Sequence, residues 1–210
     1  MLKKVLVLLI TLALPVVIYL FLKGFGKNRY DVPVYHTMSE ADCEVGADNI
    51  IMTFSSIAGG GVDHDIKALP KYKIISFIIG RSEQRGNKDY ILNLTRSYDA
   101  FIDQEDIAFI TIAMPGEHQA QGVVSFTAER DAVIPDSEKW FIHNPKEQIS
   151  IEAFLICGLG FHVEDMDPSY KMVLVDKQDR VRGYYNGLDD EETERMILET
   201  RILIDNEYNQ

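Results

Sequence analysis

Continuous apolar runs and helical spacing alternate through the second half of the chain. Residues 72–79 (YKIISFII) and 107–113 (IAFITIA) are short and almost wholly apolar, which predicts two strands buried on both faces. Between them, Asn87 can cap a helix. The apolar positions of this helix recur every three or four residues, at Tyr90, Ile91, Leu94, Tyr98 and Phe101. The pattern predicts a strand, a helix and a second strand in succession.

The C-terminal part of the chain predicts a β-hairpin followed by a helix. An apolar run at residues 172–175 leads into a polar turn at 176–180 and an alternating run at 181–186. The acidic residues 189–192 then open a helix, since negative side chains are favourable at a helix N-terminus. One face of this helix is apolar enough for burial, through Met196, Ile197, Thr200 and Ile204.

Weaker signals complete the order of the elements. Residues 50–54 and 140–142 predict short strands, and a helix opens at Pro145 and ends at Gly158 or Gly160. Buried strands alternating with helices, followed by an antiparallel pair, indicate a mixed sheet between helical layers. The predicted fold class is therefore α/β, a mixed central sheet flanked by helices, with the element order of the thioredoxin fold.

The N-terminus carries an apolar segment of membrane-spanning length. Residues 5–22 (VLVLLITLALPVVIYLFL) include no charged side chain, and a helix that spans a bilayer needs roughly 17–25 apolar residues. Pro15 is tolerated in such a helix. A cleaved signal peptide is the alternative, but the run ends in LFLKGFGK, which is a poor cleavage site. The sequence favours an uncleaved N-terminal transmembrane helix.

The basic residues on both sides of this segment do not decide its orientation by their count alone. The short N-terminus and the long trailing domain resemble a signal anchor. We therefore expect a single pass through the inner membrane, with the domain facing the periplasm. Three parts are expected, namely the anchor and its flank at 1–29, a tether and N-terminal extension at 30–70, and the folded domain at 71–210.

Charge and cysteine content narrow the class of partner. Asp and Glu outnumber Lys and Arg by 33 to 21, for a net charge of −12. An acidic surface disfavours nucleic acid and anionic lipid, and it favours basic partners. The two cysteines, Cys43 and Cys157, form no local metal or redox motif. They could form one disulfide in an oxidising compartment, or be two unrelated thiols, with Cys157 as a small buried apolar side chain.

The hairpin and terminal helix, MVLVDKQDRVRGYYNGLDDEE from residue 172, resemble the end of a SCO/SenC family protein. The anchor followed by FGKNRYDVPVY, the strand YKIISFII and the Trp140-Phe141 segment also fall where this family has them. The resemblance implies a thioredoxin-like, membrane-anchored protein facing the periplasm or intermembrane space. It further implies copper binding and a role in building the copper centre of cytochrome c oxidase, or thiol-disulfide reductase activity.

The resemblance also implies a ligand set, which this chain lacks. Family members hold copper with two cysteines in C-x-x-x-C after the first central strand and a histidine just before the hairpin, and two thiolates with an imidazole suit soft copper. Here the first position reads GRSEQRG, and the second falls at Pro168. Because no sulfur is present there to form a mixed disulfide, we expect no catalytic redox residues and no copper site of the family type. The degenerate site comprises Arg81, Ser82, Glu83, Arg85 and Pro168.

Other residues could hold a metal instead. His162, Asp165 and Asp167 surround Met166 in the loop before the hairpin, and this set could bind copper or another divalent metal. A solvated acidic loop is the simpler interpretation. Residues 63–65 (DHD) could likewise clip a metal, although a polar turn is the simpler prediction.

The degenerate loop offers a further alternative. Arg81 and Arg85 flank Glu83 near a helix start, where two guanidinium groups could hold an anion. Pairing with Glu83 and other acidic neighbours is the plainer interpretation.

Three functions remain open from the sequence. The first is a non-enzymatic accessory protein that docks to a respiratory oxidase subunit or a copper-handling protein. The second is a copper carrier with relocated ligands at His162, Asp165 and Asp167. The third is a thiol-dependent protein using Cys43 or Cys157, although neither has the electropositive setting that lowers a thiol pKa.

Overall fold

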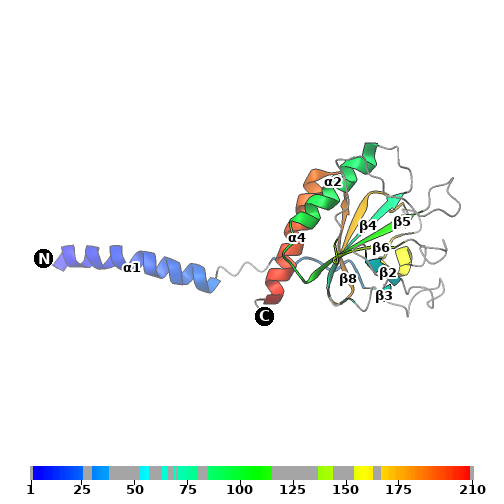
Figure 1. Ribbon diagram of the computed structural model, residues 1–210. Helices are drawn as coiled ribbons and strands as arrows, with labels where there is room; N and C mark the ends of the chain where they lie inside the picture. The colour runs from blue at the N-terminus through cyan, green and yellow to red at the C-terminus, as the bar shows by residue number, and fades with distance from the viewer. Residues whose placement is uncertain are drawn as a thin grey trace.

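The computed structural model describes residues 2–25, 30–37, 53–56, 63–65, 69, 71–79, 85–114, 137–143, 154–162 and 167–208. Their strands form a single sheet in the order β1-β8-β7-β4-β5-β6-β2-β3 (Figure 1). The sheet is mixed, because β4 pairs in parallel with β5 and β5 with β6, while the other neighbours are antiparallel. The strands are β1 (His36–Thr37), β2 (Thr53–Ser56), β3 (Asp63–Asp65), β4 (Tyr72–Ile79), β5 (Ile107–Met114), β6 (Trp140–His143), β7 (Lys171–Val175) and β8 (Arg180–Asn186).

The central strands lie where the apolar runs predict them. β4 and β5 pair in register over their full length, from Tyr72 opposite Ile107 to Ile79 opposite Met114. β7 and β8 form the expected hairpin, which joins the sheet through β7 and β4. Asp179 has a φ of 58° in the hairpin turn, a conformation that Asp tolerates better than most residues.

Three short elements come from the N-terminal part of the sheet. β2 spans Thr53–Ser56 and overlaps the strand predicted at residues 50–54, of which 50–52 lie outside the described residues. Residues 63–65 form a strand, not a polar turn, because β3 pairs with β2 and that pairing supplies its backbone hydrogen bonds. β1, β2 and β3 come from the range 30–70 expected to be a tether and N-terminal extension, and all three join the sheet.

Two helices cover one face of the sheet (Figure 1). They are α2 (Arg85–Asp99) and α4 (Asp190–Tyr208), and α2 begins two residues before the predicted cap, Asn87. Between the helices and the sheet lies one apolar cluster, which includes Tyr90, Leu94, Phe109, Trp140, Met172 and Met196. Asp189 caps α4 through its Oδ1, which accepts the N–H of Glu191 at 2.8 Å.

The opposite face of the sheet is covered in part by η3 (Phe154–Gly158), a π-helical turn. The sequence predicts an ordinary helix ending at Gly158 or Gly160, and the described part of that segment has the wider turn. Phe154, Leu155 and Cys157 pack here in a second apolar cluster with residues of β4, β5, β7 and β8. Single π turns are uncommon and often lie at functional sites.

The first helix, α1, spans Leu2–Phe25 and contains Pro15. It coincides with the predicted apolar segment. Among the described residues, no helix combines the length and the apolar character that crossing a bilayer requires.

Residues 30–37, which we call the strap, bind across the hairpin and η3. The Tyr35 N–H donates to the Val181 carbonyl at 2.9 Å, just before β1 pairs with β8. His36 Nε2 donates to the Cys157 carbonyl at 2.9 Å, which joins the strap to the π turn. Gly160 leaves room for that ring, since a Cβ there would lie 2.6 Å from His36 Cγ, and its φ of 68° favours glycine.

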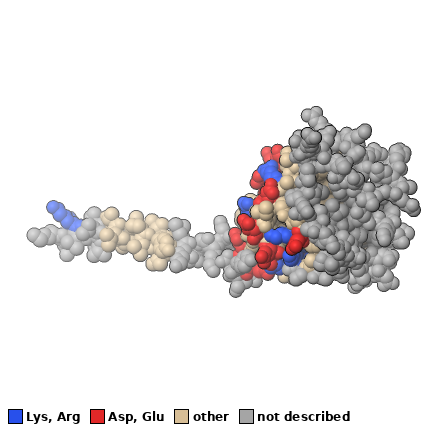
Figure 2. Space-filling model, in the orientation of Figure 1, with Lys and Arg blue, Asp and Glu red and all other residues tan. Residues whose placement is uncertain are grey.

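The helical face is acidic. Figure 2 shows Asp and Glu side chains gathered over α2 and α4. Exposed members on α4 are Asp190, Glu191, Glu194, Asp205 and Glu207. This arrangement agrees with the net charge of −12 and disfavours an anionic surface as the partner of this face.

Buried tyrosines predict that the fold weakens in alkali. Burial raises the pKa of Tyr72, Tyr90 and Tyr185, and hydrogen bonds to Glu207 and Glu199 raise those of Tyr72 and Tyr185 further. In the unfolded chain tyrosine ionises near about pH 10. The stability that these groups contribute is therefore complete below that pH and is lost as the pH rises toward the folded pKa values.

We expect the free energy of unfolding, measured by urea titration, to fall steadily above about pH 10. The Tyr185→Phe variant should fall less steeply, because one ionising group is gone. A free energy that stays level while tyrosinate absorbance rises would contradict this expectation.

Candidate functional site

Several central strands begin or end on the same side of the sheet, and we call this row of strand ends the candidate edge. β4 and β5 both end there, at Ile79 and Met114, which are paired. β7 begins and β8 ends at the same edge, where Lys171 pairs with Asn186. In open α/β sheets, ligands bind outside the carboxyl ends of the parallel strands. In sequence, the degenerate family site directly follows β4 and precedes β7.

Tyr90 of α2 braces this edge. Its hydroxyl accepts the Phe77 N–H at 3.1 Å and donates to the Lys171 carbonyl at 2.7 Å, which ties β4 to the start of β7. Its ring packs edge-on against Tyr170, with centroids 5.6 Å apart. Gly187 leaves space for the ring, because a Cβ at that position would collide with it.

The Tyr90→Phe variant should be less stable by about 1–3 kcal/mol, because it leaves the buried Phe77 N–H without its acceptor. Urea unfolding would measure this loss. Tyr98→Phe is a matched control, since among the described residues the Tyr98 hydroxyl bonds one group, the partly buried Ser137 hydroxyl, at 2.8 Å. Equal losses in the two variants would show that the two hydrogen bonds of the Tyr90 hydroxyl stabilise the fold no more than the bond of Tyr98 to Ser137.

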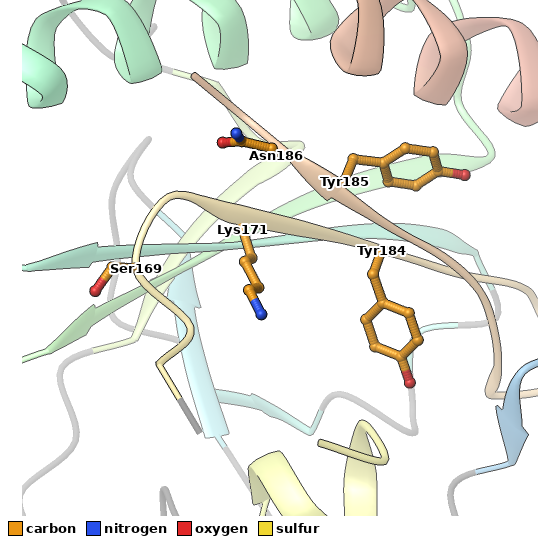
Figure 3. Close-up of a pocket in the computed structure, with 5 residues that line it drawn as sticks. All are labelled: Ser169, Lys171, Tyr184, Tyr185 and Asn186. Carbon is orange, nitrogen blue, oxygen red and sulfur yellow. The ribbon is translucent and has the colours of Figure 1, made fainter. Parts of the chain in front are cut away.

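A hollow of about 410 Å³ opens beside this brace. Figure 3 shows Lys171 and Tyr184 extending to the same side of the hairpin, away from the helices above it. The hollow is lined by Ser169, Lys171, Tyr184, Tyr185 and Asn186.

Tyr184 is held rigidly at the hollow. Its hydroxyl donates to the Leu159 carbonyl at 2.5 Å, which links β8 to the residue after η3. Its ring meets Phe161 at 5.5 Å and Tyr35 of the strap at 6.0 Å, both nearly edge-on. Burial raises the pKa of Tyr184, so the hydroxyl stays protonated well above neutral pH.

The predicted site residues fall into two groups. Pro168 is buried, and its carbonyl accepts the Lys171 N–H at 3.0 Å. Arg85 is the first residue of α2. The other members of the degenerate site, Arg81, Ser82 and Glu83, lie outside the described residues.

The candidate metal residues are only partly described. His162 and Asp167 are exposed, and Asp165 and Met166 lie outside the described residues. Asp167 accepts the Ser169 N–H at 2.9 Å and also the Ser169 hydroxyl, and these bonds lower its pKa. Within the described ranges, no group of three or more His, Cys, Asp or Glu side chains is arranged to hold a metal ion.

Cys157 is disulfide-bonded and almost fully buried in η3. The chain has one other cysteine, Cys43, which lies outside the described residues, so the pairing of these two stays a prediction. A sulfur in a disulfide is neither a nucleophile nor a thiolate ligand until it is reduced.

The sequence pattern did not single out the residues that line the hollow. Lys171 and Asn186 are neighbours only through the register of the hairpin. Counting outward from the polar turn would pair Lys171 with Tyr185, because a register shift between Leu174 and Val175 moves the pairing by one residue. Tyr90 appeared only as one apolar position of a helix, and nothing in its spacing predicts the two bonds of its hydroxyl.

No protein-family model matches the chain, and no curated protein matches its sequence. Solved structures do match it. The chain resembles BsSco, described as a member of the Sco family of cytochrome c oxidase assembly proteins, with a TM-score of 0.54, 15% identity, and coverage of 80% of this chain and 94% of BsSco. A SCO1/SenC family lipoprotein from Bacillus anthracis gives a TM-score of 0.54 at 13% identity, covering 73% and 93%.

The fold is that of the Sco/SenC proteins. It is thioredoxin-like, as the resemblance in the hairpin predicts, with a mixed sheet and helices against it. A putative electron transfer protein from Aquifex aeolicus has the same fold, with a TM-score of 0.50, 15% identity, and coverage of 81% of this chain and 97% of that protein. In this Sco-type fold, the edge described above lies between the end of β4 and the start of β7.

Proposed function

We propose that this chain is a membrane-anchored, Sco-like accessory protein that docks during assembly of a respiratory oxidase, without thiol redox chemistry of its own. The observation that carries this proposal is a Sco-type fold whose sequence has no cysteine in the loop after β4. BsSco is described as a member of a family of cytochrome c oxidase assembly proteins, and the same process is proposed here.

The chemistry of the edge supports docking rather than catalysis. The loop GRSEQRG offers charge and hydroxyl groups but no sulfur, and Pro168 offers no side-chain ligand. Thiol-disulfide exchange requires a thiolate that attacks a disulfide. The one described cysteine, Cys157, lies in η3 and is already disulfide-bonded. The described tyrosines of this edge, Tyr90 and Tyr184, use their hydroxyl groups to hold neighbouring segments of the chain together.

Location is part of the proposal. The charge-free run at residues 5–22, within α1, supports a membrane anchor. A disulfide at Cys157 supports an oxidising compartment, because disulfides persist outside the reducing cytosol. Together they favour a domain that faces the periplasm from the inner membrane.

Copurification tests the proposal. The tagged full chain, extracted from its native membranes in mild detergent, should bring down subunits of a respiratory oxidase or a copper-handling protein. Asp167→Arg changes an exposed residue at the candidate edge, and Asp103→Arg changes an exposed residue in the turn after α2, away from that edge. The proposal expects the first variant to lose the partner and the second to keep it.

Two outcomes would contradict the proposal. A clean preparation with no respiratory or copper-handling subunit would remove its main prediction. Stoichiometric Cu(I) in the purified chain that disappears in His162→Ala would replace docking with the carrier function.

A further inference from the structure

The exposed side of the strap is largely apolar. Tyr30, Val34 and Tyr35 are 73%, 46% and 62% exposed, and these three large side chains fall within residues 30–35. Of the exposed strap residues, Asp31 is the one that carries a charge. Elsewhere in the described part of the folded domain, exposed large apolar side chains occur singly along the chain, at Leu92, Ile102, Leu188 and Leu198. Tyrosine is amphipathic and is enriched where a protein meets the membrane–water interface.

The strap is held firmly on the domain. Val32 is buried in the core cluster, and its carbonyl accepts a hydrogen bond from Arg182. At the start of the strap, the Tyr30 carbonyl accepts the Asn206 amide at 2.8 Å, and further along the Tyr35 N–H bonds β8. The exposed apolar side chains therefore lie on a backbone that is already fixed, and they need no further ordering of that backbone to meet a surface.

Chain length keeps the strap close to the end of α1. Tyr30 follows Phe25, the last residue of α1, by five residues, and the charge-free run ends at Leu22. An extended chain spans at most about 3.6 Å per residue, so Tyr30 lies within roughly 18 Å of Phe25. The helical residues after Leu22 add about 4.5 Å. With α1 in the membrane, the strap begins within about 22 Å of the hydrocarbon, and the headgroups fill roughly 5–7 Å of that distance.

The charges around the strap select the kind of lipid. Asp31 lies 3.4 Å from Arg182, and Glu207, at the end of α4, lies 3.0 Å from Lys177. Asp205 is exposed at the same end of α4. Anionic headgroups would repel these carboxylates, whereas zwitterionic headgroups have no net charge. A zwitterionic phospholipid layer therefore suits this side of the domain.

We propose that the strap lies on the surface of a zwitterionic phospholipid bilayer, with Tyr30, Val34 and Tyr35 at the level of the headgroups. The tyrosine hydroxyl groups meet water and headgroups, and the rings with Val34 meet the boundary of the acyl chains. This inference rests on the membrane anchor of the proposed function.

The strap and the candidate edge lie at opposite ends of β8. Val181 pairs with His36 of the strap, and Asn186 pairs with Lys171 at the candidate edge. At about 3.4 Å per residue of antiparallel strand, Val181 and Asn186 are about 17 Å apart. A strap on the bilayer therefore leaves the candidate edge away from the lipid, where a partner can reach it.

Photo-cross-linking of the full chain in phosphatidylcholine liposomes tests this contact. The probe p-benzoylphenylalanine replaces Tyr35 or Val34 in two variants. In the control it replaces Leu188, which is 40% exposed and follows the far end of β8. Illumination joins the probe's ketone carbon to a nearby C–H group, so a lipid adduct reports contact with the bilayer. We expect lipid adducts at positions 35 and 34, and none above the dark background at position 188, with thermal unfolding showing that each variant is folded.

An alkaline wash of the liposomes separates this inference from the proposed anchor. A chain that washes out is not anchored, which overturns both. A chain that stays in the membrane overturns the strap contact alone if positions 35 and 34 give no lipid adduct, no more than position 188, or a cross-link to a second copy in place of lipid. Adducts that form only after anionic phosphatidylglycerol is added would also overturn it, because contact would then depend on basic residues such as Lys27 and not on the apolar strap.

Discussion

Replacing Asp176 by alanine should lower the free energy of unfolding by about 3–5 kcal/mol, which is the range for breaking a buried ion pair from one side. The Asp176 carboxylate is 3% exposed and accepts four hydrogen bonds. Two come from the backbone N–H groups of Gln178 and Arg180, and two from the guanidinium groups of Arg180 and Arg182. The substitution therefore opens the hairpin turn and leaves the buried Arg182 with the exposed Asp31 in place of a buried anion.

The loss of Asp176 should also weaken the contacts of the strap, because Arg182 binds the strap as well as Asp176. Its guanidinium group also donates to the Val32 carbonyl and lies 3.4 Å from Asp31. Asp176→Asn is the informative second variant, because it keeps an oxygen for the turn while removing the charge. It should cost less than Asp176→Ala, as measured by urea unfolding with hydrogen exchange of residues 30–37. Equal losses, or full protection of the strap in both variants, would contradict this account.

Asp179→Asn is expected to lower the free energy of unfolding by about 2–3 kcal/mol, because it leaves a buried ammonium group unpaired. The Lys73 side chain is fully buried in β4, and its Nζ lies 2.6 Å from Asp179 Oδ1. The loss is placed below that of a wholly buried pair because Asp179 is 25% exposed and water screens it in part. Asparagine suits the positive φ at this position, so the variant tests charge rather than backbone strain.

The same pair provides its own control. Lys73→Met removes the buried charge and keeps the length of the side chain, so it should cost little or add stability. In the double variant Lys73→Met, Asp179→Asn, most of the loss caused by Asp179→Asn should disappear. Urea unfolding of the four proteins gives the coupling free energy. A double variant that is no more stable than Asp179→Asn would show that Lys73 does not need its partner.

The core of the fold could be predicted from the sequence because its signals are local. β4 is a continuous apolar run, and the β7–β8 hairpin is an apolar run, a polar turn and an alternating run. β2 and β3 could not be placed as well, because strands of four and three residues owe their form to pairing, β3 with β2 and β2 with the distant β6. The π turn at η3 has the same apolar spacing as an ordinary helix end, so the sequence does not distinguish them.

The candidate site was predictable only in outline. Counting from Asp176 places Pro168 before β7, and the structure has it there, buried. The hollow depends instead on the cross-strand pair Lys171–Asn186 and on Tyr184 held by Leu159. Such contacts follow from register and from side-chain direction, which a single sequence specifies only after the strands are paired.

The strap lies in sequence between the proposed membrane anchor and the rest of the domain, and it contacts the candidate site. Residues 30–37 follow α1 closely in sequence and contact the hairpin through Arg182, the π turn through His36 and the hollow through Tyr35. The Tyr30 carbonyl also accepts the Asn206 side-chain amide at 2.8 Å, near the end of α4. A membrane-held N-terminus would therefore fix the orientation of the domain as well as its location.

Oxidase activity in cells lacking this chain tests the central claim most directly. We compare complementation by the wild-type chain and by the Cys43→Ser, Cys157→Ser variant, with protein levels matched on immunoblots. The account predicts that activity falls without the chain and that both proteins restore it fully, because assembly needs the docking edge and no sulfur. Restoration by the wild-type chain alone, at equal protein levels, would contradict it and assign the function to the cysteines.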